Sequence, residues 1–137
     1  MLAQSDIREM VENASALIPV PLSPIRHRER GYNQATWLAR ALSPSKTQIR
    51  WLSRSGDLAA QHTLGRRDRL RGVQDVFTAT EAWARNRRPD AIVLIDDVMT
   101  TGATLAGAAR ALLDAGASDV SALVFARTEA PAGQDRS

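Results

Sequence analysis

One stretch in the second half of the chain constrains the fold more than any other. Residues 91–95 (AIVLI) form a continuous apolar run, which is typical of a parallel strand buried on both faces of a sheet. A helical pattern follows over 103–115 and ends at Gly116, and a second apolar strand is predicted over 120–126. Two parallel strands joined by a helix form a right-handed βαβ unit. The sequence therefore predicts an α/β fold with a central, mainly parallel sheet flanked by helices.

The rest of the chain supplies further elements of the same kind. Helices are predicted over 5–16 and 33–42, short strands over 17–22 and 48–52, and a helical turn over 81–86. Trp37 has the helical spacing of a core residue, with Trp51 and Trp83 less clearly assigned. Residues 53–76 show no clear period and predict a long mobile connection that carries one helical turn. We expect a single domain over 1–128 and a flexible tail over 129–137.

Composition excludes several kinds of site. The 137 residues include no cysteine, which excludes disulfides, thiolate metal sites and cysteine nucleophiles, and two histidines are too few for a typical histidine zinc site. Lys46 is the sole lysine among 18 basic residues, and the arginines favour an anionic ligand such as phosphate. A net charge of +3 is weak evidence for nucleic-acid binding. With no long apolar run and no signal-peptide pattern, we expect a soluble, cytoplasmic protein without membrane contact.

The residues that carry chemistry are concentrated in 96–104, between the predicted strand and helix. Ligands of open α/β sheets bind beyond the carboxyl ends of the strands. Asp96 and Asp97 offer adjacent carboxylates, which accept hydrogen bonds from a vicinal diol and can lie near Mg²⁺. Residues 100–104 (TTGAT) place small and hydroxyl side chains at a helix N-terminus, which favours a phosphate. A ribose 5-phosphate group satisfies both halves, and the alternative is an acidic pair that only caps the helix.

This segment also resembles the signature of a known protein family. Residues 92–104 resemble, position by position, the thirteen-residue signature for phosphoribosyl diphosphate (PRPP) of the type I phosphoribosyltransferases. The resemblance extends to 20–22 (VPL), 28–34 (RERGYNQ) and 61–77, which look like the ComF/GntX branch of competence-associated, amidophosphoribosyltransferase-like proteins. Together these segments cover most of 17–127. The resemblance implies the type I phosphoribosyltransferase fold.

The resemblance also implies roles for individual residues. Asp96 and Asp97 would bind the ribose hydroxyls as the catalytic pair, Asp97 would assist proton transfer, and both would contact Mg²⁺ only through the ligand. The 5′-phosphate would be cradled by Val98, Met99, Thr100, Thr101, Gly102, Ala103 and Thr104. The diphosphate would be bound by Arg26, Arg28 and Arg30, and a flexible closing loop would include Gln61, Arg66 and Arg67. For both arginine groups, a solvated surface is the alternative interpretation.

Three departures from the family pattern stand out. Many members begin with a four-cysteine, zinc-binding module, whereas this chain has no cysteine. Gly72 occupies a position where the family has asparagine, and Asp75-Val76 stand where Gly-Ala is expected before Phe77. The last two departures concern the closing loop and leave the PRPP signature intact.

Two functions follow as hypotheses. The first is an enzyme that transfers a 5-phosphoribosyl group from PRPP to an unidentified acceptor. The second is a non-catalytic, competence-type protein that binds single-stranded DNA or a protein partner. An uncovered sheet edge would favour a homodimer. A phosphoacceptor receiver domain is excluded because no lysine follows Lys46, and a P-loop NTPase is excluded because no Gly-Lys-Ser/Thr triplet occurs.

Overall fold

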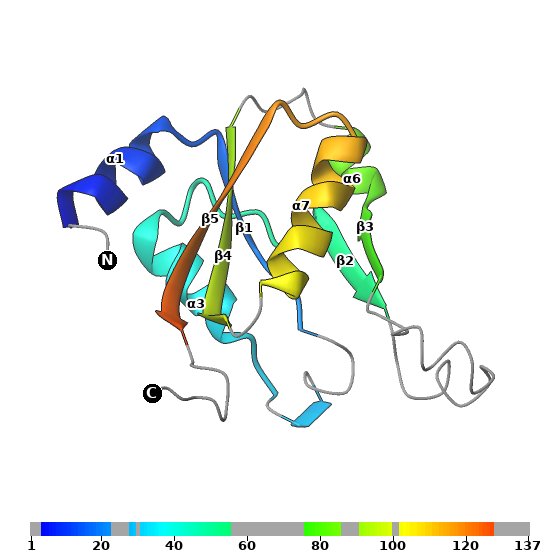
Figure 1. The fold of residues 1–137 in the computed structure, drawn as a ribbon, viewed down its shortest axis with the longest axis horizontal. Helices are drawn as coiled ribbons and strands as arrows, with labels where there is room; N and C mark the ends of the chain where they lie inside the picture. Colours follow the sequence, from blue (N-terminus) through cyan, green and yellow to red (C-terminus); the bar gives the residue numbers. More distant parts are fainter. Residues whose placement is uncertain are drawn as a thin grey trace, which may run out of the picture.

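The computed structural model describes residues 4–22, 28–29, 31–55, 76–85, 91–99 and 102–127. The elements along the chain are α1 (Gln4–Asn13), β1 (Ala16–Pro19), α3 (Gln34–Leu42), β2 (Leu52–Ser55), β3 (Val76–Ala79), α6 (Glu81–Ala84), β4 (Ala91–Met99), α7 (Ala103–Asp114) and β5 (Asp119–Arg127). The predicted α/β class is confirmed, with helices on both faces of a parallel sheet (Figure 1). This architecture is consistent with a type I phosphoribosyltransferase-like fold. None of the helices in these ranges is long and apolar enough to span a membrane.

The main sheet has the order β1-β4-β5, and all its strands are parallel. β4 lies in the centre, where Val93 pairs with Leu17 of β1 and Ile95 pairs with Leu123 of β5. The apolar run that opens β4 matches this central position, because a strand with neighbours on both edges and helices on both faces has little contact with water. The predicted β4–α7–β5 unit is therefore confirmed.

Side chains of the central strand alternate between two hydrophobic clusters. Ile92 and Leu94 belong to the cluster on the face covered by α7, whereas Val93 and Ile95 belong to the cluster on the face covered by α1 and α3. Figure 1 shows α1 and α3 on one side of the sheet and α7 on the other. This two-sided burial fixes the register of β4, because a slip by one residue would exchange the two faces.

A second, two-stranded sheet lies beside α7 (Figure 1). β2 and β3 pair antiparallel, with Arg54 directly opposite Phe77. The predicted strand over 48–52 was misplaced, since Gln48 donates its backbone N–H to Leu17 at 2.9 Å and β2 begins only at Leu52. The prediction of a connection over 53–76 was wrong at both ends, which form β2 and β3, and residues 56–75 lie outside the described ranges.

The tryptophans differ from the sequence expectation. Trp37 is 68% exposed, so its assignment to the core was wrong. The buried side of α3 is formed by Ala35 and Ala39, and residue 37 points away from both because helical neighbours turn by about 100° per residue. Trp51 and Trp83 are buried and meet edge to face, with ring centroids 5.5 Å apart.

The ends of two helices depend on specific polar contacts or backbone conformations. Asn33 caps α3 by accepting a hydrogen bond from the Ala35 N–H at 3.0 Å, and its amide donates to Val20 O at 3.1 Å. The N-terminus of α3 is thereby fixed to the residue that follows β1. Gly116 has φ +109, a left-handed conformation that suits glycine, and it ends α7 as the sequence predicted. The expected tail over 129–137 lies outside the described residues.

Candidate functional site

The acidic pair lies at the carboxyl end of the central strand, within β4, so the prediction of a loop over 96–104 was wrong for its first four residues. Asp96 follows Ile92 and Leu94 at two-residue spacing, so it continues their series on the face that α7 and the β2–β3 sheet cover. Asp96 and Asp97 are both half-buried. The backbone N–H of Val98 donates to Asp97 Oδ1 at 3.0 Å, which orients this carboxylate. Figure 1 shows the end of β4 next to the beginning of α7, so the segment of β4 that carries the acidic pair lies near the N-terminus of this helix.

The Asp96 carboxyl group has a strongly raised pKa. The pKa of Asp96 is raised from 3.8 to about 6. Burial is the largest cause, and the hydrogen bond and negative charge of neighbouring Asp97 contribute in the same direction. The positive charge of Arg54 and a backbone hydrogen bond act in the opposite direction. The negative charge of Asp97 thus disfavours ionisation of Asp96.

Arg54, which was not predicted as a site residue, also belongs to this region. Its Nη1 donates to Pro21 O at 2.9 Å, and its guanidinium carbon lies 5.1 Å from the centre of the Phe77 ring. A strand was not predicted at either residue, so their pairing was missed. The signal that could have found it is the run Val76-Phe77-Thr78, three residue types that favour strands.

The loop residues of the predicted phosphate cradle are described in part. Val98 and Met99 are the last residues of β4 and pair with β5, and the Val98 side chain is 41% exposed. Gly102 has φ +87 and immediately precedes α7, so a left-handed residue turns the chain into the helix. Ala103 opens the helix, and Thr104 lies half-buried in its first turn. Thr100 and Thr101 lie outside the described residues.

Of the predicted diphosphate-binding and closing-loop residues, one lies within the described ranges. This residue is Arg28, whose side chain is exposed. The other predicted residues of these two groups lie outside the described ranges: Arg26, Arg30, Gln61, Arg66 and Arg67. Their roles stay predictions.

The acidic pair also limits how a metal ion could be held. Within the described ranges, there is no cluster of three or more histidine, aspartate or glutamate side chains that could hold a metal ion. Two carboxylates suit Mg²⁺ when substrate oxygens and water complete its shell, which is how this ion is usually bound beside phosphates. Asp96 and Asp97 therefore fit an indirect role, in which the ligand supplies most of the oxygen atoms.

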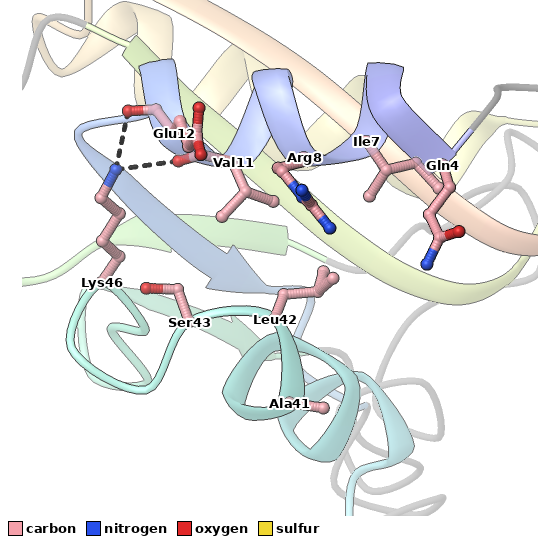
Figure 2. Close-up of a pocket in the computed structure, with 9 residues that line it drawn as sticks. All are labelled: Gln4, Ile7, Arg8, Val11, Glu12, Ala41, Leu42, Ser43 and Lys46. Atoms are coloured by element: carbon pink, nitrogen blue, oxygen red, sulfur yellow. Dashed lines mark hydrogen bonds between the residues drawn. The ribbon is translucent and has the colours of Figure 1, made fainter.

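A separate hollow of about 460 Å³ lies between α1 and the end of α3 (Figure 2). Its lining includes none of the residues of β4, α7 or the loop between them. Lys46 at its rim donates to Val11 O at 2.8 Å and to Glu12 O at 2.9 Å, so its ammonium group caps the last turn of α1. The hollow is lined by apolar side chains together with Gln4, Arg8, Glu12 and Ser43, and its lysine is already bound to backbone. We place the candidate site at the acidic pair because that pair lies at the carboxyl end of the central parallel strand, where ligands of open α/β sheets bind.

Comparison with known proteins gives relatives of one kind. The chain is 37% identical over 116 residues to the DNA utilization protein YhgH of Escherichia coli O6:H1. It is 34% identical over 118 residues to Competence protein F of Haemophilus influenzae and 39% identical over 114 residues to Competence protein ComFC of Bacillus subtilis. No family profile and no solved structure matches.

These alignments each include 82% of this chain and 49%, 50% and 44% of the three relatives. The chain thus spans about half the length of the proteins that it matches. The relatives support the resemblance to the ComF branch. The chain belongs to the ComF family of competence-associated proteins.

Proposed function

We propose that this chain binds PRPP, or another ribose 5-phosphate ligand, at the carboxyl end of β4 and transfers the phosphoribosyl group to an acceptor. The observation that carries the proposal is the half-buried Asp96–Asp97 pair, at the end of the central parallel strand and followed by the turn into α7. An acidic pair alone repels anions, so its place beside a helix N-terminus suits a ligand with hydroxyls at one end and phosphate at the other.

Each part of the site has a chemical task in this proposal. The carboxylates of Asp96 and Asp97 accept hydrogen bonds from the ribose hydroxyls and so orient the sugar. The first turn of α7, entered through Gly102, faces the 5′-phosphate with its backbone N–H groups and its positive dipole end. In the transfer, the bond from C1 to the diphosphate breaks and the acceptor forms the new bond at C1. Catalysis would rest on holding the ligand in place and on stabilising the departing charge.

Mg²⁺, when bound through the diphosphate oxygens, would neutralise part of the leaving group's charge. The carboxylates of Asp96 and Asp97 would bind the ligand, and the ligand would bind the ion, so the acidic pair would contact Mg²⁺ only indirectly. The signature loop binds the phosphoribosyl group, which is the same for every acceptor, so this loop does not define the acceptor.

Calorimetric titration of PRPP with Mg²⁺ tests the proposal. We expect saturable binding by the wild-type protein and its loss in the Asp96→Asn/Asp97→Asn variant. The matched control is Asp114→Asn, which removes an exposed carboxylate at the far end of α7. Wild-type protein that does not bind PRPP would contradict the proposal, as would a double variant that binds it normally.

A second candidate function is binding of single-stranded DNA. It is favoured by the names of the relatives, which refer to DNA utilization and competence, and by the exposure of Tyr32 (49%) and Trp37 (68%). Exposed aromatic rings can stack with bases, and Arg28 and Arg40 nearby in the sequence are exposed cations. The test is fluorescence anisotropy of a labelled oligothymidylate at low and moderate salt. Binding that weakens with salt and is reduced by Trp37→Ala supports this function, and no binding at low salt excludes it.

A further inference from the structure

Arg54 is held in a fixed position at the same end of the sheet as the acidic pair. The backbone N–H of Val20 donates to Ile95 O at 2.9 Å, so Pro21, the next residue, lies beside the start of the Asp96-Asp97 segment. Pro21 O in turn accepts the hydrogen bond from Arg54 Nη1 at 2.9 Å. Two backbone-anchored contacts therefore bring the guanidinium to the same end of the sheet as Asp96.

The ring of Phe77 supports the guanidinium group of Arg54. Arg54 and Phe77 are directly opposite in the β2–β3 pair, and the guanidinium stacks over the ring at 5.1 Å. Phe77 also packs against α7 at Gly107, where an added Cβ would meet Phe77 Cδ2 at 3.3 Å. The absence of a side chain at Gly107 thus allows the ring, and the guanidinium on it, to approach α7.

The electrostatics agree with this geometry. Asp96 shares its sheet face with Ile92 and Leu94, the face on which β2, β3 and α7 pack. The charge of Arg54 acts on Asp96, lowering its pKa against the larger effects of burial and of Asp97. Arg54 is therefore close enough to offset part of the negative charge that the acidic pair concentrates at this edge.

We propose that Arg54 is a specificity-determining residue, whose fixed positive charge offsets the acidic pair and lets the site accept a polyanionic ribosyl ligand. This inference rests on the proposed function. A pair of carboxylates binds ribose hydroxyls well but repels phosphate groups, and the repulsion grows with each added charge on the ligand. A stacked, hydrogen-bonded guanidinium supplies the compensating charge without a loss of side-chain freedom on binding.

The test compares the affinities for PRPP and for ribose 5-phosphate, measured by calorimetry at equal Mg²⁺ concentration. In Arg54→Met we expect PRPP binding to weaken about tenfold and ribose 5-phosphate binding about threefold, because PRPP carries the larger charge. Arg54→Lys keeps the charge and should recover most of the PRPP affinity. Phe77→Leu, which keeps Arg54 but removes the ring beneath it, should produce a smaller loss with the same dependence on ligand charge.

Arg50→Met is the matched control, since Arg50 is an exposed arginine four residues earlier, and it should change neither affinity. Near-ultraviolet circular dichroism of the packed Trp51–Trp83 pair verifies that each variant is folded. A loss in Arg54→Met that is equal for the two ligands would identify a merely structural residue and overturn the inference, as would no loss. Wild-type protein that binds neither ligand would instead refute the proposed function itself.

Discussion

Replacing Asp96 by asparagine should stabilise the ligand-free protein at neutral pH while it removes ligand binding. The folded state holds this carboxyl group in a half-buried position beside Asp97, where burial and the second negative charge oppose ionisation. Asparagine has nearly the same shape and no charge, so it relieves both costs. Stability and ligand binding then change in opposite directions, as expected for a residue whose position serves function.

The size of the effect follows from the pKa. A rise from 3.8 to about 6 corresponds to about 3 kcal/mol of unfavourable free energy if the whole shift is counted. Because the group is only half-buried, solvent screening reduces this value, and we expect about 1 kcal/mol of stabilisation at neutral pH. For a domain of this size, that change raises Tm by about 3 °C.

The raised pKa of Asp96 also determines how the free energy of unfolding changes with pH. Between about pH 4 and pH 6 the folded protein binds more protons at Asp96 than the unfolded chain does, so the wild-type free energy of unfolding falls as pH rises through this window. The Asp96→Asn variant lacks this contribution. Its advantage over the wild type should therefore be small near pH 4 and complete above pH 6.

Urea unfolding of the two proteins across this pH range measures the difference directly. Asp114→Asn is the control, because it makes the same chemical change at an exposed position at the far end of α7. A variant that is less stable than the wild type at neutral pH, or a stability difference that does not change with pH, would refute the reasoning.

Three further substitutions test other parts of the structure. Gly102→Ala should cost about 1 kcal/mol, seen as a lower urea midpoint, because φ is +87 there, and it should also weaken PRPP binding. Lys46→Met removes two hydrogen bonds to the end of α1 and should lower stability by about 1 kcal/mol without changing PRPP affinity, as measured by denaturation and calorimetry. Leu94→Ala should cost about 2–5 kcal/mol in the same unfolding assay, since Leu94 is fully buried in the central strand. An unchanged unfolding midpoint would contradict the reasoning in each case.

The central part of the fold could be predicted because its signals are local. The apolar run of β4, the helical period of α7 and the glycine at 116 each lie within one element. The structure contains these elements in the predicted order, but β4 continues four residues beyond the predicted end at 95. The error at Trp37 has a physical reason, since α3 packs on the sheet through small alanines and turns its larger tryptophan outward.

The site could be predicted only in the segment that is contiguous in sequence. The acidic pair and Gly102 are close along the chain, so a motif reveals them. Arg54 is positioned by the pairing of β2 with β3, two four-residue strands separated by 20 residues along the chain, and no local period encodes that pairing. The raised pKa of Asp96 likewise depends on burial, which arises only when β4 is covered.

The most direct test of the central claim is a ¹H–¹⁵N correlation spectrum of the protein titrated with PRPP and Mg²⁺, because it reports where the ligand binds. The account predicts that the shifted signals cluster at Asp96, Asp97 and the first turn of α7, with Arg54 among them. Signals around Lys46, beside the hollow between α1 and α3, should not move. Shifts confined to that hollow, or no shifts at saturating PRPP, would contradict a phosphoribosyl site at the end of β4.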